Sequence, residues 1–125
     1  MKLASSLLIG FLLVSSGFIL PSAEPPPVRV LVWDEQQPEQ KRAYDGGFLG
    51  EAIATHLVKQ PGFKVRSANL ASPEQGLSSA DLDATDVLVW WGHVRQGDVK
   101  SERVADVVER VKSGRLDRKS TRLNS

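Results

Sequence analysis

Three apolar runs stand out along the middle of the chain. Val28 to Trp33 is apolar except for Arg29, and the stretch Asp86 to His93 contains an unbroken apolar run from Val87 to Trp91. Runs of this length that are rich in β-branched residues predict strands buried on both faces, as in parallel sheets. Phe63 to Ser67 alternates apolar and basic residues, which predicts a strand near the edge of the sheet.

Helical periodicity fills the intervals between these runs. Apolar residues at spacings of three and four predict helices from Phe48 to Lys59 and from Ser101 to Lys112. Asp45 lies where it could cap the first of these helices. Ser78 and Asp81 have the spacing of a capping box, which predicts one short helical turn before the third strand.

The alternation of strands and helices predicts an α/β fold with a parallel sheet. In the flavodoxin-like strand order the second strand lies outside, so the first and third strands are neighbours and their carboxyl ends meet at the edge where such sheets bind ligands. A further strand is expected directly after Gly114, but no apolar run follows. The sequence therefore predicts a sheet truncated after three strands, the N-terminal part of a longer domain.

The ends of the chain differ in composition from the middle. Residues 1–23 predict a cleaved signal peptide and hence export to the periplasm or the exterior; an uncleaved anchor over Leu3 to Leu20 is the alternative. Residues 24–27 form a proline-rich linker, and 28–114 are the predicted domain. Residues 115–125 resemble a translated sequencing adapter, which predicts a non-native tail, with a disordered basic tail as the alternative.

Charge and residue types exclude several classes of function. The net charge is +1, but residues 24–114 hold eleven basic and fourteen acidic residues, which argues against nucleic acid as a partner. The chain has no cysteine, so a thiolate nucleophile and a cysteine-ligated metal are excluded. It also has no glycine-rich phosphate loop and no Gly-x-Ser-x-Gly elbow.

Polar and aromatic residues gather at the predicted carboxyl ends of the first and third strands. The candidates for substrate binding are Trp33, Asp34, Glu35, Trp91 and Gly92, and His93 is the candidate catalytic acid or base. Indole faces beside carboxylates suit a sugar, whose C–H face stacks on aromatic rings while its hydroxyls form hydrogen bonds. His93 and a carboxylate could equally hold a divalent metal.

Each candidate also has a structural interpretation. Adjacent residues of a strand point to opposite faces, so one of the two neighbouring tryptophans belongs to the core, and Trp90 is the one expected there. Trp33 could likewise pack in the core, and His93 could be a hydrogen-bonded structural residue. Asp34 and Glu35 could be solvated loop charges.

Several segments together resemble the ThuA-like (trehalose utilisation) family over about Val28 to Gly114. The resemblance is carried by Val32–Glu35, Ile53–Leu57, Val65–Leu70, Pro73–Leu77 and above all Thr85–Val94, which ends in Trp-Trp-Gly-His. It implies a class I glutamine amidotransferase-like, flavodoxin-like fold, a bacterial origin and a role in the utilisation of trehalose or related disaccharides and keto-sugars. That family lacks the amidotransferase cysteine, as this chain does.

The chain departs from the family at its histidines. Further family histidines are replaced here by residues such as Pro38 and Gln96, which puts catalysis in doubt. Three hypotheses follow: a sugar-modifying enzyme using His93, a non-catalytic sugar-binding domain, or an interaction domain of a larger secreted protein. The partner expected is a small-molecule sugar, with no nucleic acid and no membrane span after cleavage.

Overall fold

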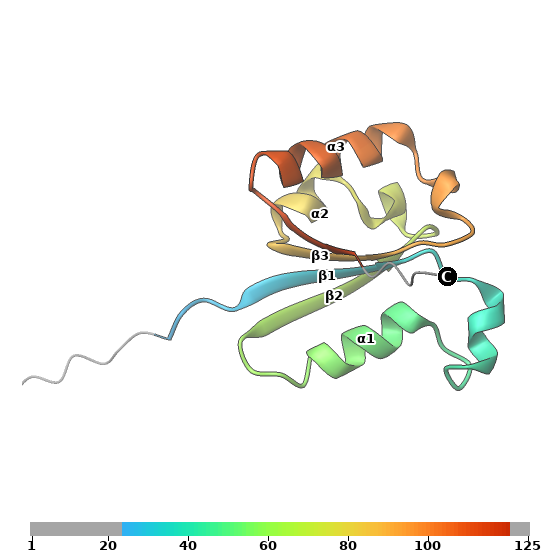
Figure 1. The fold of residues 1–125 in the computed structure, drawn as a ribbon. Helices are drawn as coiled ribbons and strands as arrows, with labels where there is room; N and C mark the ends of the chain where they lie inside the picture. Colours follow the sequence, from blue (N-terminus) through green and yellow to red (C-terminus); the bar gives the residue numbers. More distant parts are fainter. Residues whose placement is uncertain (1–23, 121–125) are drawn as a thin grey trace, which may run out of the picture.

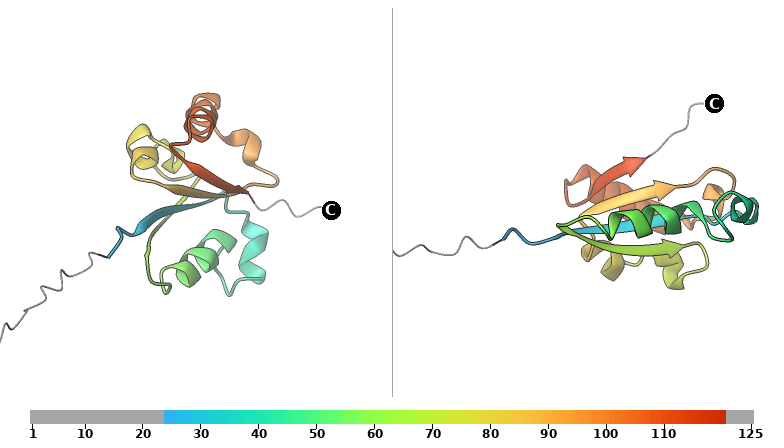
Figure 2. Two further views of the ribbon diagram at one scale, coloured as in Figure 1. Left: turned by 60° about the vertical axis from the view of Figure 1, so that its left-hand side comes forward. Right: turned by 90° about the horizontal axis from the view of Figure 1, so that it is seen from below.

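A parallel sheet forms the centre of the structure, a computed structural model that describes residues 24–120 (Figure 1). β1 (Val28–Asp34) pairs with β2 (Phe63–Asn69) on one side and with β3 (Val87–Trp91) on the other. β4 (Asp117–Ser120) completes the order β2-β1-β3-β4. The strands point the same way in Figure 2. The predicted α/β parallel sheet, with the second strand outside the first, is confirmed.

β4 corrects the expectation that the sheet ends after three strands. It pairs in parallel with β3 from Val87 opposite Asp117 to Trp90 opposite Ser120. Leu116, just before it, is buried in the core, although the sequence predicted a tail from residue 115. A strand at the rim of a sheet is held by its backbone hydrogen bonds and can be polar, so no apolar run marked it. The predictions for residues 1–23 and 121–125 lie outside the described residues.

Helices cover both faces of the sheet. α1 (Leu49–Leu57) lies on one face, and α2 (Ser79–Asp83) and α3 (Ser101–Lys112) lie on the other (Figure 1). The bounds of α3 are those that the valine spacing predicted. Ser78 caps α2 as predicted, because its hydroxyl oxygen accepts a hydrogen bond from the Asp81 amide at 3.1 Å. Within residues 24–120 no helix is both long and apolar enough to cross a membrane.

The cap predicted for α1 is wrong, although the helix starts within one residue of the predicted Phe48. Asp45 does not cap it: the helix begins four residues later, at Leu49, and Asp45 lies in a turn with φ of +49°. The first amides of α1 are bound from elsewhere. Gln40 Oε1 accepts from the Leu49 amide at 3.0 Å, and Asp34 Oδ2 accepts from the Gly50 amide at 2.5 Å.

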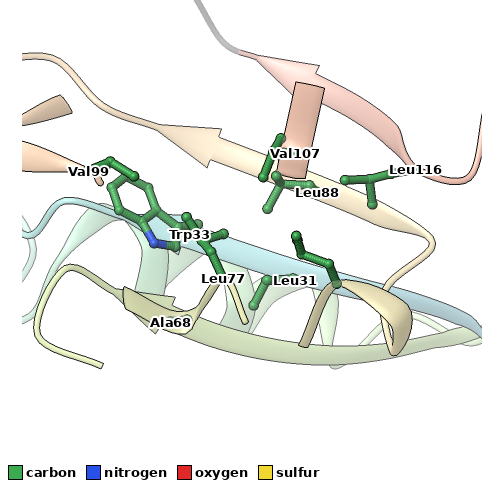
Figure 3. Close-up of a cluster of buried hydrophobic side chains, with 9 residues drawn as sticks. Leu31, Trp33, Ala68, Leu77, Leu88, Val99, Val107 and Leu116 are labelled. Carbon is green, nitrogen blue, oxygen red and sulfur yellow. The ribbon is translucent and has the colours of Figure 1, made fainter. Parts of the chain in front are cut away.

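β1 is buried on both faces, as its apolar run predicted. Leu31 and Trp33 point to the side of α2 and α3, where they join the core cluster in Figure 3. The other members of that cluster are Ala68, Leu77, Leu82, Leu88, Val99, Val107 and Leu116. Val30 and Val32, also buried, alternate with them and face α1. β1 is thus the strand around which the two layers are built.

Candidate functional site

The carboxyl ends of β1 and β3 meet, as the sequence predicted. Asp34 lies opposite Trp91 in the register, and the Glu35 amide donates to the Trp91 carbonyl at 3.2 Å. The two groups of candidate residues, 33–35 and 91–93, are therefore side by side at one edge of the sheet. What each side chain does there differs from one to the next.

Glu35 holds the loop that follows β3. Its side-chain carboxylate accepts hydrogen bonds from the backbone amides of His93, Val94 and Arg95 at 2.8, 2.9 and 2.9 Å. The Gln37 side-chain amide donates to the same carboxylate. Glu35 is only 1% exposed. Three consecutive amides that converge on one carboxylate form an anion-binding concavity, which here is filled from within the chain.

These hydrogen bonds set the ionisation of Glu35. Burial by itself would raise the pKa of the carboxyl group, because the charged form loses its water. The hydrogen bonds from Gln37 and from the three loop amides favour the charged form and together outweigh burial, so the pKa lies below its usual range. Glu35 is therefore a buried anion at neutral pH. Its predicted role in binding a substrate is wrong for this structure, since its oxygens are occupied and inaccessible, and it is no solvated loop charge either.

Asp34 has a matching role on the other side of the sheet. It is 2% exposed, and besides binding the Gly50 amide it accepts from the Gln36 amide at 2.6 Å. A Cβ atom added to Gly50 would lie 2.5 Å from the Asp34 Cβ, so glycine is what lets α1 approach β1 this closely. Asp34 anchors the start of α1 and does not face a ligand, contrary to the sequence prediction. Gly50 was not singled out from the sequence, where a single glycine in a helical pattern gives no signal.

Trp33 is a core residue and not a wall of the site. Its side chain has no exposed surface, and its ring stacks on that of Trp90 with centroids 4.4 Å apart and planes inclined at 27°. Its indole N–H donates to the Gln75 carbonyl at 2.8 Å. The substrate-binding prediction for Trp33 is therefore wrong, because register places it opposite Trp90, whose side chain points into the same layer. The prediction that Trp90 packs in the core is confirmed.

Gln75 supports the site in a way that the sequence did not reveal. Its side-chain amide donates to the Asp98 carbonyl at 2.9 Å, and its Oε1 accepts from the Lys100 amide at 2.9 Å. It thereby joins β1, through Trp33, to the entry of α3. Gln75 and its neighbour Glu74 both have positive φ angles, 57° and 51°, which non-glycine residues rarely adopt. No residue type at these positions signals that conformation.

Trp91, Gly92 and His93 make up the open part of the edge. Trp91 is partly exposed on the face that carries α1, but α1 lies over β1 and β2, which leaves this part of β3 accessible. His93 is exposed, and its backbone is fixed by Glu35. A Cβ on Gly92 would lie 3.1 Å from Trp90 Nε1 and 3.0 Å from Gln96 Cβ, so the absence of a side chain here lets Trp90 and Gln96 lie close to the backbone.

The metal site predicted at His93 finds no support. The part of the chain described here contains no group of three or more histidine, aspartate or glutamate side chains placed to share a metal ion. Glu35, whose carboxylate binds the His93 backbone amide, already accepts four hydrogen bonds. His93 thus stands as a single exposed imidazole.

An apolar cavity of about 250 Å³ lies near the edge but on the other face of the sheet. It is lined by Trp90, Gln96 and Gly97 and by three valines of α3, namely Val104, Val107 and Val108. Trp90 and Trp91 point to opposite faces, so the cavity and the exposed Trp91 ring are separated by the sheet.

No protein-family model and no curated protein matches the chain. A functional proposal therefore rests on two observations. One is the geometry at the carboxyl ends of β1 and β3, and the other is the sequence resemblance to the ThuA-like family.

Proposed function

We propose that this chain is an exported ThuA-like domain, of flavodoxin-like architecture, that binds a sugar or a sugar derivative at the carboxyl edge of β3. The observation that supports the proposal is the pairing of a partly exposed Trp91 ring with an exposed His93 on a loop fixed by a buried carboxylate. An indole face and a neighbouring imidazole supply the stacking surface and the hydrogen-bonding group that a pyranose requires.

The burial of the Asp34 and Glu35 carboxylates favours binding over catalysis. General acid–base chemistry on a sugar commonly uses two carboxyl groups that reach the substrate. Asp34 and Glu35 are buried and bound to backbone amides, so neither reaches a ligand at this edge. The exposed His93 imidazole is the group that an enzymatic role would use.

The test is calorimetric titration of the full chain with trehalose. We expect measurable binding, at least tenfold weaker binding by Trp91→Ala, and loss of binding by His93→Ala without unfolding. Phe63→Ala, at the opposite end of the sheet and 41% exposed, serves as the control and should bind like the parent. Unchanged titration of both edge variants would refute the site, and hydrolysis of trehalose that depends on His93 would favour the enzyme.

A further inference from the structure

The opposite end of the sheet carries exposed apolar side chains. Val28, at the start of β1, is 38% exposed, and its register partner Phe63, at the start of β2, is 41% exposed. Val58, just after α1, is 59% exposed. Register partners in parallel strands point to the same face, and the Val28 amide donates to the Gly62 carbonyl at 2.8 Å, so the turn after α1 lies beside the start of β1. These three residues define the amino-end patch.

Three lysines lie at the same end of the fold as this patch and have no carboxylate partner among the described residues. Three acidic residues at this end, Asp83, Asp86 and Glu109, are each paired with an arginine, namely Arg110, Arg29 and Arg115, whereas Glu24 in the linker forms no ion pair with another described residue. Lys59, Lys64 and Lys112 are exposed, and among the described residues no carboxylate lies within ion-pair distance of them. The amino end therefore presents apolar side chains together with ammonium groups that are free to bind anions.

The chain enters the fold at this same end. Figures 1 and 2 show residue 24 and the linker at the end of the sheet opposite the loops that follow β1 and β3. In the sequence, the apolar stretch Leu3–Leu20 is separated from Val28 by seven residues, which can span at most about 25 Å. In the uncleaved form of the chain, a bilayer that holds the apolar stretch is thus within reach of the amino-end patch.

We propose that the amino-end patch is a membrane-contacting surface that fits an anionic lipid bilayer. Val28, Val58 and Phe63 insert into the interface, while Lys59, Lys64 and Lys112 bind lipid phosphates. Contact at this end turns the Trp91 and His93 edge away from the bilayer and toward solvent. The inference does not depend on the proposed sugar site, because it uses other residues at the other end of the sheet.

The absence of cysteine makes a direct test possible, since a single introduced cysteine gives one labelling site. In the full chain, Val58→Cys and Val94→Cys are each labelled with a polar fluorophore and mixed with vesicles of phosphatidylcholine and phosphatidylglycerol. Val94 is the matched control, because it is 69% exposed at the opposite end. We expect the label at position 58 to be protected from quenching by aqueous iodide and the label at position 94 to stay accessible.

The dependence of binding on the lysine charges distinguishes specific binding to an anionic membrane from nonspecific hydrophobic adsorption. Replacing Lys59 and Lys64 by glutamine should lower the affinity of the patch for the anionic vesicles about 25-fold, whereas the same change at Lys41 and Lys100 should not. Equal quenching at positions 58 and 94 would overturn the proposal. If the label at position 58 were protected equally on vesicles of pure phosphatidylcholine, the preference for anionic lipid would be wrong. If a soluble acidic polymer protected this label and vesicles did not, the partner of the patch would be a macromolecule and the membrane proposal would be wrong.

Discussion

Glu35 is the residue on which the candidate site depends most. It is a buried anion that accepts hydrogen bonds from three backbone amides of the loop after β3. If this loop moved, the carboxylate would lose all three bonds. The loop that carries His93 therefore has its conformation only while this carboxylate is in place. A buried residue thus fixes the backbone of His93, a residue of the proposed binding site.

Glu35→Gln should destabilise the protein by about 3 kcal/mol, since three buried amides lose a charged acceptor and the new NH₂ group faces other donors. The free energy of unfolding in urea measures this loss. Glu39→Gln, at an exposed glutamate four residues on, should change it by less than about 0.5 kcal/mol. Equal stability of the parent and the Glu35 variant would show that the loop does not need the charge.

Residue types at the strand ends were predictable from the sequence, but their orientation was not. The run Val28–Trp33 placed Asp34 and Glu35 at the correct edge, because carboxyl ends of parallel strands share one edge. Whether a carboxylate there faces a ligand or a backbone amide depends on the path of two loops distant in the sequence. Glu35 and His93 are 58 residues apart, and nothing local to either encodes their hydrogen bond.

At the scale of elements, α1 is positioned by its contact with β1 and not by its own cap. The Gly50 amide reaches Asp34 only because position 50 has no side chain. Helix periodicity predicted α1 correctly to within two residues at its ends, since the apolar face alone marks a helix. Its cap was mispredicted, because a carboxylate that binds its first turn comes from β1.

Gly50→Ala should destabilise the fold by about 2 kcal/mol, because overlap with Asp34 forces α1 away from β1 by more than the helix propensity of alanine can offset. Urea denaturation followed by circular dichroism gives the value. Gly97→Ala is the matched control: an added Cβ there has no atom within 4 Å, and stability should stay within about 0.5 kcal/mol of the parent. If the two variants behaved alike, the close approach of α1 would not be limiting.

β4 shows the limit of reading elements from apolar runs. Strands β1 and β3 are interior and need apolar side chains on both faces, so their sequences reveal them. The outermost strand needs only a partner for its backbone, and Asp117–Ser120 reads as a polar tail. The sequence therefore predicted the two interior strands and the edge strand β2, and missed β4 at the other edge.

At the scale of the whole molecule, ionised carboxylates join segments distant in the sequence. Arg29 binds Asp86 across β1 and β3 through its side chain and lowers the pKa of Asp86 to about 2. Arg66 and Ser78 bind Asp81, and the hydroxyl of Ser78 contributes most to lowering the pKa of that carboxyl group. Together with Glu35, these groups link β1, β2, α2 and the loop after β3.

Their ionisation predicts how stability depends on pH. A carboxyl group with a lower pKa in the folded state stabilises the fold above its unfolded pKa, and this stabilisation is lost as the pH falls through the folded value. For Asp86 the loss should therefore occur between about pH 4 and pH 2. Urea midpoints measured from pH 7 to pH 2 should be level above about pH 5 and then decline.

Arg29→Met provides the control for that decline. Without the guanidinium group the folded pKa of Asp86 should rise toward its ordinary value, so the variant should be less stable at pH 7 and lose less stability on acidification. A decline as steep as that of the parent would mean that other groups govern acid unfolding.

The stacked indoles of Trp33 and Trp90 give the molecule an optical signal of its own assembly. Two indole rings 4.4 Å apart couple their electronic transitions, and this pair exists only when β1 and β3 are in register. The third tryptophan, Trp91, points to the opposite face of the sheet, and like Trp90 it is partly exposed. Circular dichroism in the aromatic region thus follows the pairing of β1 with β3, while fluorescence quenching follows the exposed surface of Trp90 and Trp91. The chain can therefore report its own folding without a label.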